Sequence, residues 1–328
     1  MSARADELVY FNEPYPPHDI DNVLDLDIFS TVSEKSFQDQ QWRRILIAFY
    51  RQDSSHIMPI LQELALQGKP EAKYMMGLSL ADGLNMEVDH SEAVDWFKAA
   101  AEAGVPLAKE RLATHFARGD GVPRDYQLAL HWFEQAAESG LPASQFSLAT
   151  LYALGLGVNA PDHERAYEWH LKAAQNGSLE AQHNLATMYY YGEGVSRNRI
   201  EAIRWYKRAA QKGYVRAQYN LGYLYSRGEG VDKDINMARY WYARAAAHGD
   251  GAALNNLGTL YAEGNGVEQN LITASIYFQK AAQRGHERGL LNRQLILEYL
   301  SDDELLVILD KAQKTNHQTH GSVNNQLP

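Results

Sequence analysis

The feature that most constrains the fold is a 36-residue period, which is clearest between Ser178 and Gly249. Two units in that stretch share a leucine, an aromatic residue, a Gly-Glu-Gly-Val turn and a tryptophan, each 36 residues apart. Self-similarity at a fixed period of this length indicates that one supersecondary unit is being reused. Because such arrays grow by stacking, a length of 328 residues does not require separate globular domains.

The same period extends over six units, which we delimit by their closing glycines. Tryptophan recurs at one place in the first five units, and tyrosine takes that place in the sixth. Terminal repeats of such arrays are typically degenerate. We therefore predict a capping helix pair over residues 37–68 and capping helices over residues 286–313. The six predicted units are residues 69–104, 105–140, 141–177, 178–213, 214–249 and 250–285.

Within each unit the spacing predicts two helices joined by a tight glycine turn. Leu221 and Tyr225 fall on one face of a first helix, and Trp241 and Ala245 fall on one face of a second. Gly228 lies between them and supplies the positive φ that ends a helix. An aspartate that can cap the second helix precedes it in several units. The predicted fold is an all-α solenoid of stacked antiparallel helix pairs, with the repeated tryptophans and tyrosines in its core.

The two ends of the chain lack this pattern. Residues 1–36 carry eight acidic and two basic side chains, a net charge of −6 out of the total of −10. An acidic, proline-containing segment without periodicity predicts disorder, and we predict the same for the polar tail at residues 314–328. Short apolar runs within residues 1–36 leave a second interpretation open, in which the segment is a motif that docks on a partner or on this protein itself.

Composition excludes several classes of function. The chain has no cysteine, which rules out disulfides and thiolate chemistry. Its net charge of −10 argues against nucleic-acid binding. We also expect no membrane insertion, because no run of about 18 apolar residues occurs. The first residues do not match a secretory signal, so we expect a cytoplasmic location.

No motif predicts catalysis, a cofactor or a metal site. The repeated Gly-Glu-Gly-Val lacks the third glycine and the Lys-Ser/Thr of a phosphate-binding loop, so we interpret it as the turn of the repeat. His163 and His170 form an isolated pair without metal-ligand spacing. Ser79 lies in a near match to a nucleophile elbow but falls inside a predicted helix. We therefore expect a protein that is not an enzyme.

The array Ala-Gln-x-x-Leu-Gly-x-x-Tyr-x-x-Gly-x-Gly-Val, followed by Ala-x-x-Trp-Tyr-x-x-Ala-Ala-x-x-Gly, resembles the Sel-one-like repeat, a relative of the tetratricopeptide repeat. The resemblance covers roughly residues 69 to 285. It implies a right-handed superhelix whose concave face is built from the first helix of each unit. It also implies an adaptor in protein complexes, in bacteria often in signalling, envelope or host-interaction contexts. The first unit departs from the pattern at its turn, where Asn85 and Met86 replace glycine and valine.

By the same resemblance, residues one and two places before the repeated leucine should project to the concave side. In the fourth to sixth units an asparagine stands directly before that leucine, and its amide could bind an extended peptide or could be structural. Tyrosine and arginine, which are frequent at binding hot spots, follow one turn on. The predicted binding face is His183, Asn184, Thr187, Tyr190, Tyr191, Tyr219, Asn220, Tyr223, Arg227, Asn255 and Asn256.

Three functional hypotheses follow. The first is a non-catalytic scaffold that holds a segment of another protein in its groove. The second is a regulator that its own N-terminal segment, residues 1–36, keeps inhibited by occupying that groove. The third, for which the sequence offers least support, is an envelope-associated or carbohydrate-binding repeat protein.

Overall fold

The computed structural model describes residues 54–84 and 86–308 together with Ile45 and Phe49. The predictions for residues 1–36 and 314–328, and for Asn85 in the first turn, lie outside these residues. The regular structure of the described residues is helical throughout, without a strand. This confirms the predicted all-α class.

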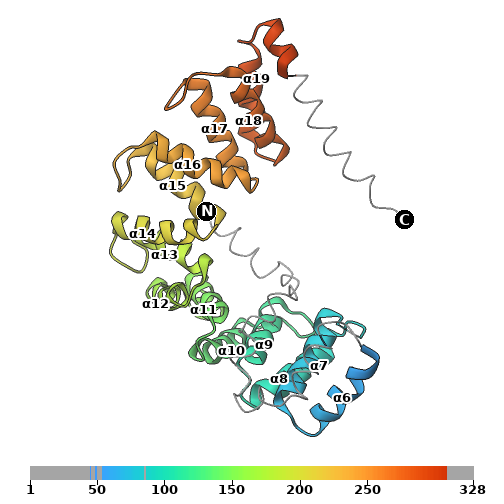
Figure 1. Ribbon diagram of the computed structural model, residues 1–328. Coiled ribbons are helices and arrows are strands. Elements are labelled where there is room, and N and C mark those ends of the chain that lie inside the picture. Colours follow the sequence, from blue (N-terminus) through green and yellow to red (C-terminus); the bar gives the residue numbers. More distant parts are fainter. Residues whose placement is uncertain (1–44, 46–48, 50–53, 85, 309–328) are drawn as a thin grey trace, which may run out of the picture. The chain divides into compact units, whose positions relative to one another are not determined.

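Each predicted unit contains two helices of 13 residues that follow one another along the chain (Figure 1). The first helices of the units are α7 (Pro70–Asp82), α9 (Pro106–Arg118), α11 (Pro142–Leu154), α13 (Leu179–Tyr191), α15 (Val215–Arg227) and α17 (Gly251–Glu263). The second helices are α8 (His90–Glu102), α10 (Tyr126–Glu138), α12 (His163–Gln175), α14 (Arg199–Gln211), α16 (Ile235–Ala247) and α18 (Leu271–Gln283). Helix α6 (Ser54–Leu66) precedes the array, and α19 (Glu287–Leu297) and a helical segment at residues 302–308 follow it.

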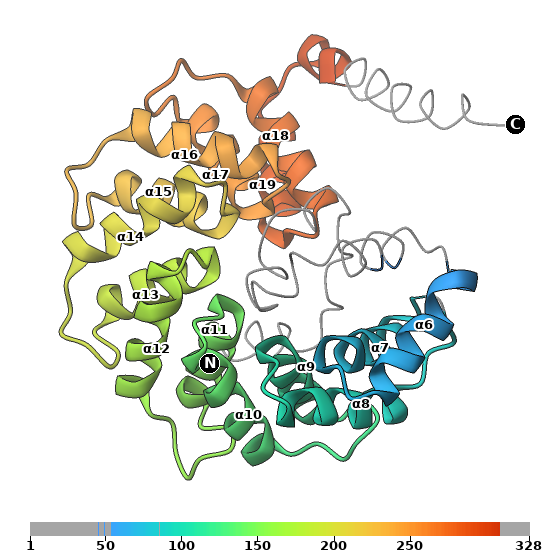
Figure 2. The same ribbon diagram turned by 60° about the horizontal axis from the view of Figure 1, so that its bottom comes forward.

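The chain divides into two compact units. The first unit contains α6 to α12, and the second contains most of α13 and all of α14 to α19. Consecutive helices pack on one another from α6 to α12 in the first unit, as α7, α8 and α9 do in Figure 2, and from α14 to α19 in the second. Helix α17 also packs on α19, two helices further on, so first helices lie next to first helices.

Glycine and side-chain caps fix the bounds of the helices. Gly228 ends α15 in the left-handed conformation (φ 71°), as expected for the first glycine of the turn. Asp234 begins α16 by accepting a hydrogen bond from the backbone N–H of Met237. Ser301 and Glu304 form a capping box, in which Glu304 Oε2 accepts from the Ser301 backbone N at 2.9 Å. Local sequence therefore sets where the chain turns.

The aromatic core differs from the prediction by one residue. Trp205 and Trp241 are buried, but the tryptophans of the first three repeats are only half-buried. The residue directly after the tryptophan position is buried in all six repeats. These residues are Phe97, Phe133, His170, Tyr206, Tyr242 and Phe278.

A small residue on the first helix makes room for that buried ring. A Cβ placed on Gly222 would stand 2.5 Å from Tyr242 Cδ1, and one on Gly258 would stand 2.6 Å from Phe278 Cε1. Glycine at these positions therefore lets an aromatic ring lie directly against the backbone of the first helix. Such contact removes a large apolar area from water and stabilises the hairpin.

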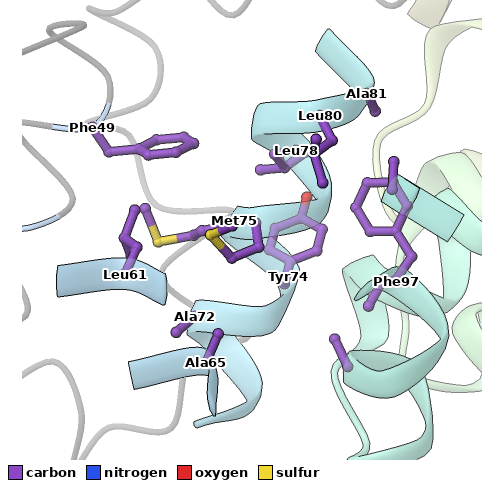
Figure 3. Packing of buried hydrophobic residues seen from close by; sticks show 14 of the residues in the cluster. Phe49, Leu61, Ala65, Ala72, Tyr74, Met75, Leu78, Leu80, Ala81 and Phe97 are labelled. Atoms are coloured by element: carbon purple, nitrogen blue, oxygen red, sulfur yellow. The ribbon is translucent and has the colours of Figure 1, made fainter. Parts of the chain in front are cut away.

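The core of the first unit begins with α6. Leu61 of α6 and Phe49 are fully buried and pack with Met75 of α7 (Figure 3). On the other side of α7, the rings of Tyr74 and Phe97 lie 5.9 Å apart between centroids. The first repeat is thus covered by apolar side chains that precede it in sequence, as expected for a capped end of a repeat array.

Candidate functional site

The second unit contains all eleven residues of the predicted binding face. They lie on its three first helices α13, α15 and α17. In the first unit the two positions before the repeated leucine are buried instead of projecting freely. Those first-unit residues are Tyr74, Met75, Glu110, Arg111, Phe146 and Ser147.

The asparagines of the predicted binding face link neighbouring repeats. Asn220 Nδ2 donates to His183 Nε2 at 3.0 Å, and His183 Nδ1 lies 3.2 Å from Asn184 Oδ1. One repeat further on, burial raises the pKa of Tyr219 and of Tyr242, and hydrogen bonding with the Asn256 amide opposes part of that rise. These amides therefore hold one repeat to the next, which favours the structural interpretation of the asparagine ladder.

The ladder continues beyond the predicted binding face. Asn292 of α19 stands 36 residues after Asn256, and its Nδ2 donates to Asn255 Oδ1 at 2.9 Å. Asn292 was missed because Arg293 replaces the leucine that marks this position in the other units. The 36-residue period alone would have found it.

His183 is the centre of the link between the fourth and fifth repeats. Burial lowers the pKa of His183 to about 4. The rings of Tyr206 and Tyr214 lie 5.5 and 5.4 Å from its ring. A neutral imidazole with its proton on Nδ1 donates to Asn184 and accepts from Asn220, so both ring nitrogens are satisfied.

Thr187 is also engaged within the repeat. Its Oγ1 donates to the His183 carbonyl at 3.1 Å and lies 2.8 Å from the hydroxyl of Tyr206. Burial raises the pKa of Tyr206 to about 12, so this hydroxyl stays protonated. Thr187 therefore helps to fix the buried aromatic ring of its own hairpin.

A second cluster joins the ends of α13 and α15. The Tyr190 hydroxyl donates to Glu229 Oε2, and Arg227 Nε donates to Glu229 Oε1 at 2.8 Å. Arg199 Nη2 lies 3.7 Å from Glu229 Oε2, with its guanidinium 5.4 Å from the centroid of the Tyr190 ring. The Tyr190 and Arg227 hydrogen bonds lower the pKa of Glu229. The carboxylate thus fixes three larger side chains.

Glu229 belongs to the Gly-Glu-Gly-Val motif, whose predicted role was only that of a turn. The two glycines do form the turn, with φ of 71° and 79°. The glutamate between them organises the neighbouring tyrosine and arginine side chains. A charged residue held between two turn glycines was the signal that could have indicated this role.

Two tyrosines beside this cluster remain open to solvent. Tyr191 is 64% exposed and stands edge-on to Tyr190, with 4.8 Å between ring centroids. Tyr223 is 38% exposed, and the Arg227 guanidinium lies 5.6 Å from the centroid of its ring. This part of the predicted binding face offers aromatic surface and cationic groups in fixed positions.

The histidines and carboxylates of the described residues are spread over the helices. Within residues 54–84 and 86–308, no three His, Cys, Asp or Glu side chains come together as they would around a metal ion. His163 is exposed at the start of α12, whereas His170 is buried against Phe146, with ring centroids 5.4 Å apart. Across the same residues, every helix is too short or too polar to cross a membrane.

Comparison with known proteins agrees with this architecture. The family model described as Sel1 repeat matches residues 70–105, 106–141, 142–178, 179–214, 215–250 and 251–286. Each match begins one residue after the first residue of the corresponding predicted unit. A comparison with curated proteins gives no significant match.

Solved structures with the same fold include two with substantial coverage. One is c5321, a protective antigen present in uropathogenic Escherichia coli strains and displaying an SLR fold, with a TM-score of 0.75 and 26% identity over 89% of this chain. The match covers 65% of c5321, so this chain spans less than two thirds of that protein. The other is a Sel1 repeat protein from Oxalobacter formigenes, with a TM-score of 0.65, 30% identity and coverage of 74% of this chain and 98% of that one.

Proposed function

Because the chain belongs to the Sel1 repeat family, whose repeats generally mediate protein interactions, we propose that it is a non-catalytic scaffold for a segment of another protein. The proposed site is the part of the predicted binding face around Tyr191, Tyr223 and Arg227. The observation that carries this proposal is that both tyrosines are exposed, Tyr191 against the Tyr190 ring and Tyr223 beside the Arg227 guanidinium. The neighbouring Asn220, in contrast, is engaged between repeats.

The chemistry of the site suits a partner segment with an apolar or aromatic residue next to an acidic one. Tyrosine rings provide contact area with little loss of side-chain entropy, and tyrosine and arginine are enriched at hot spots. Arg199, Arg227 and Glu229 together carry a net charge of +1, which favours an acidic group on the partner. Because Glu229 already holds Tyr190 and Arg227, less ordering is needed on binding.

The test is selection of a displayed library of random 12-residue peptides on the full chain. We expect the selected peptides to combine aromatic or aliphatic residues with acidic ones. The double variant Tyr191→Ala/Tyr223→Ala should bind them about 100-fold more weakly, since two hot-spot contacts of about 1.4 kcal/mol each are removed. Neither side chain is buried, so the thermal unfolding of the variant should match that of the wild type.

The matched control is Tyr240→Ala. Tyr240 is 47% exposed but lies on the second helix α16, outside the predicted binding face. It should leave peptide affinity unchanged. Wild-type affinity in the double variant, or an equal loss in both variants, would refute the proposed site.

The hypothesis that residues 1–36 inhibit the scaffold stays a prediction, because that segment lies outside the described residues. Stronger peptide binding by a chain that lacks residues 1–36 would support it.

A further inference from the structure

A hollow of about 470 Å³ lies in the second unit, where the fifth repeat meets the sixth. Its apolar wall includes Leu254 and Leu257 of α17 and Tyr277 of α18. Lys280 and Arg284, at the end of α18, also line it. The hollow is separate from the predicted binding face, because it shares no residue with it.

Three residues that depart from the repeat pattern line this hollow. Comparison with residues 36 positions earlier shows leucine for glutamine at Leu254, alanine for lysine at Ala243 and tyrosine for tryptophan at Tyr277. Leucine lacks the amide of glutamine, alanine is shorter than lysine, and tyrosine is smaller than tryptophan. All three residues line the same space, so the joint between the fifth and sixth repeats differs in chemistry from the joint before it.

The replacement of glutamine has a specific consequence for hydrogen bonding. In the fifth repeat, Gln218 Nε2 donates to the Ala210 carbonyl at 3.0 Å, and Gln145 makes the equivalent bond to Ala137 at 3.1 Å. Ala246 lines the hollow and stands 36 residues after Ala210. The apolar Leu254 side chain, which replaces the glutamine, has no N–H to donate to the Ala246 carbonyl. The Ala246 carbonyl accepts from the backbone N–H groups of Gly249 and His248. The Ala210 carbonyl accepts the equivalent two backbone bonds and still takes the Gln218 amide, so the Ala246 carbonyl can accept a ligand N–H in the same way.

The charged groups of the hollow are both cationic. Lys280 and Arg284 are the charged residues in its lining, and both side chains are exposed. The Arg284 guanidinium is positioned against the α16–α17 turn, since a Cβ on Gly249 would stand 3.0 Å from its Cζ. A ligand held here therefore meets a carbonyl acceptor, an apolar wall and two positive charges.

We propose that this hollow binds the C-terminal residue of a peptide whose last side chain is apolar. The terminal carboxylate would pair with Lys280 and Arg284, and the N–H of the same residue would donate to the Ala246 carbonyl. The side chain would lie against Ala243, Ala247 and Tyr277, above the buried Leu254 and Leu257. A peptide C-terminus carries its N–H and its carboxylate on one carbon, which distinguishes it from an internal segment or an acidic side chain.

The probe is a fluorescein-labelled Gly-Ser-Gly-Leu peptide with a free carboxylate, titrated with the full chain and followed by fluorescence anisotropy. We expect saturable binding that weakens at least tenfold when the peptide ends in an amide or in aspartate. The double variant Lys280→Gln/Arg284→Gln should lose binding to a similar extent. The variant Leu254→Gln supplies the amide that Gln218 places on the Ala210 carbonyl. That amide would occupy the Ala246 carbonyl and should weaken binding at least tenfold while preserving the fold.

Two controls separate this site from others. Arg244→Gln changes the residue 36 positions before Lys280 and should have no effect. The Tyr191→Ala/Tyr223→Ala variant should also bind the probe normally. The proposal is overturned if acid and amide peptides bind equally, if Leu254→Gln binds like the wild type, or if the acid peptide shows no saturable binding below 1 mM, roughly the weak end of measurable affinities.

Discussion

In the first unit, the residue before the repeated leucine of the second repeat is Arg111, and its two terminal nitrogens lie 3.3 and 3.0 Å from the two carboxylate oxygens of Asp82. In the second unit, the same place in the fifth repeat is Asn220, which donates to His183. Both contacts reach back to the preceding repeat. The repeat spacing thus fixes where neighbours are joined, while the chemistry of the joint differs between an ion pair and a neutral amide link.

The difference matters because the two joints respond to different conditions. The Arg111 side chain is 6% exposed and that of Asp82 is 26% exposed, so the pair is partly shielded from salt. The amide link depends on a neutral histidine, because a protonated His183 would have no nitrogen to accept from Asn220. The first joint should therefore be sensitive to loss of a charge and the second to acid.

The largest expected effect is that of Arg111→Met, which keeps side-chain bulk but leaves the Asp82 carboxylate without its partner. We expect the free energy of unfolding to fall by about 3 kcal/mol, as for other ion pairs broken on one side. Urea denaturation followed by circular dichroism measures this. The matched control is Arg204→Met, which removes the exposed pair with Glu201 and should cost less than about 0.5 kcal/mol. Equal costs for the two variants would mean that the buried ion pair does not hold the first unit together.

The next effect is a loss of stability in acid that depends on His183. Its folded pKa of about 4 lies below the ordinary 6.5, through burial and the nearby charge of Arg216. As pH falls below 6.5, the unfolded chain binds a proton that the folded chain does not. The stabilisation is therefore complete above pH 6.5 and lost between 6.5 and 4, up to about 3 kcal/mol.

The variant His183→Gln isolates this contribution. Burial also lowers the pKa of His115 in the first unit, so the variant should keep some acid sensitivity from that residue. The difference between wild type and variant, measured by urea denaturation from pH 7.5 to 4.5, reports His183 alone. A constant difference across this range would show that His183 does not link the repeats as a neutral group.

The smallest effect is expected for Asn220→Ala at neutral pH. It removes one donor to a buried ring nitrogen, and we expect a cost of about 1 kcal/mol. Asn236→Ala, at an exposed position of α16, is the control and should lie within about 0.5 kcal/mol of the wild type. If both changes cost the same, the amide ladder would not be a structural link, and Asn220 would return to the list of residues for partner contact.

Much of the architecture could be predicted because it depends on residues that are close together in the sequence. Gly228 and Asp234 act within a few residues of themselves, so their roles as C-cap and N-cap follow from local chemistry. The buried ring could not be predicted in the same way. Trp241 and Tyr242 are adjacent, and only the approach of α15, with Gly222 beneath the ring, decides that Tyr242 packs against the backbone.

The same distinction applies to the binding face. Tyr191 and Tyr223 could be selected for this face from their positions in the repeat, and both are exposed. Glu229 and Asn292 were not selected, because their roles depend on Tyr190 and Asn255, which lie 39 and 37 residues away. Contacts between repeats join residues that no local window contains.

By itself the sequence determined the period, the helix pairs and their turns, because these depend on spacing and on the conformations of single residues. Only the tertiary structure decided which side chains bridge the repeats, which remain open to solvent, and where a hollow forms. Those outcomes depend on how neighbouring repeats pack, and a substitution such as leucine at position 254 shows its effect only against the residues of the adjacent repeat.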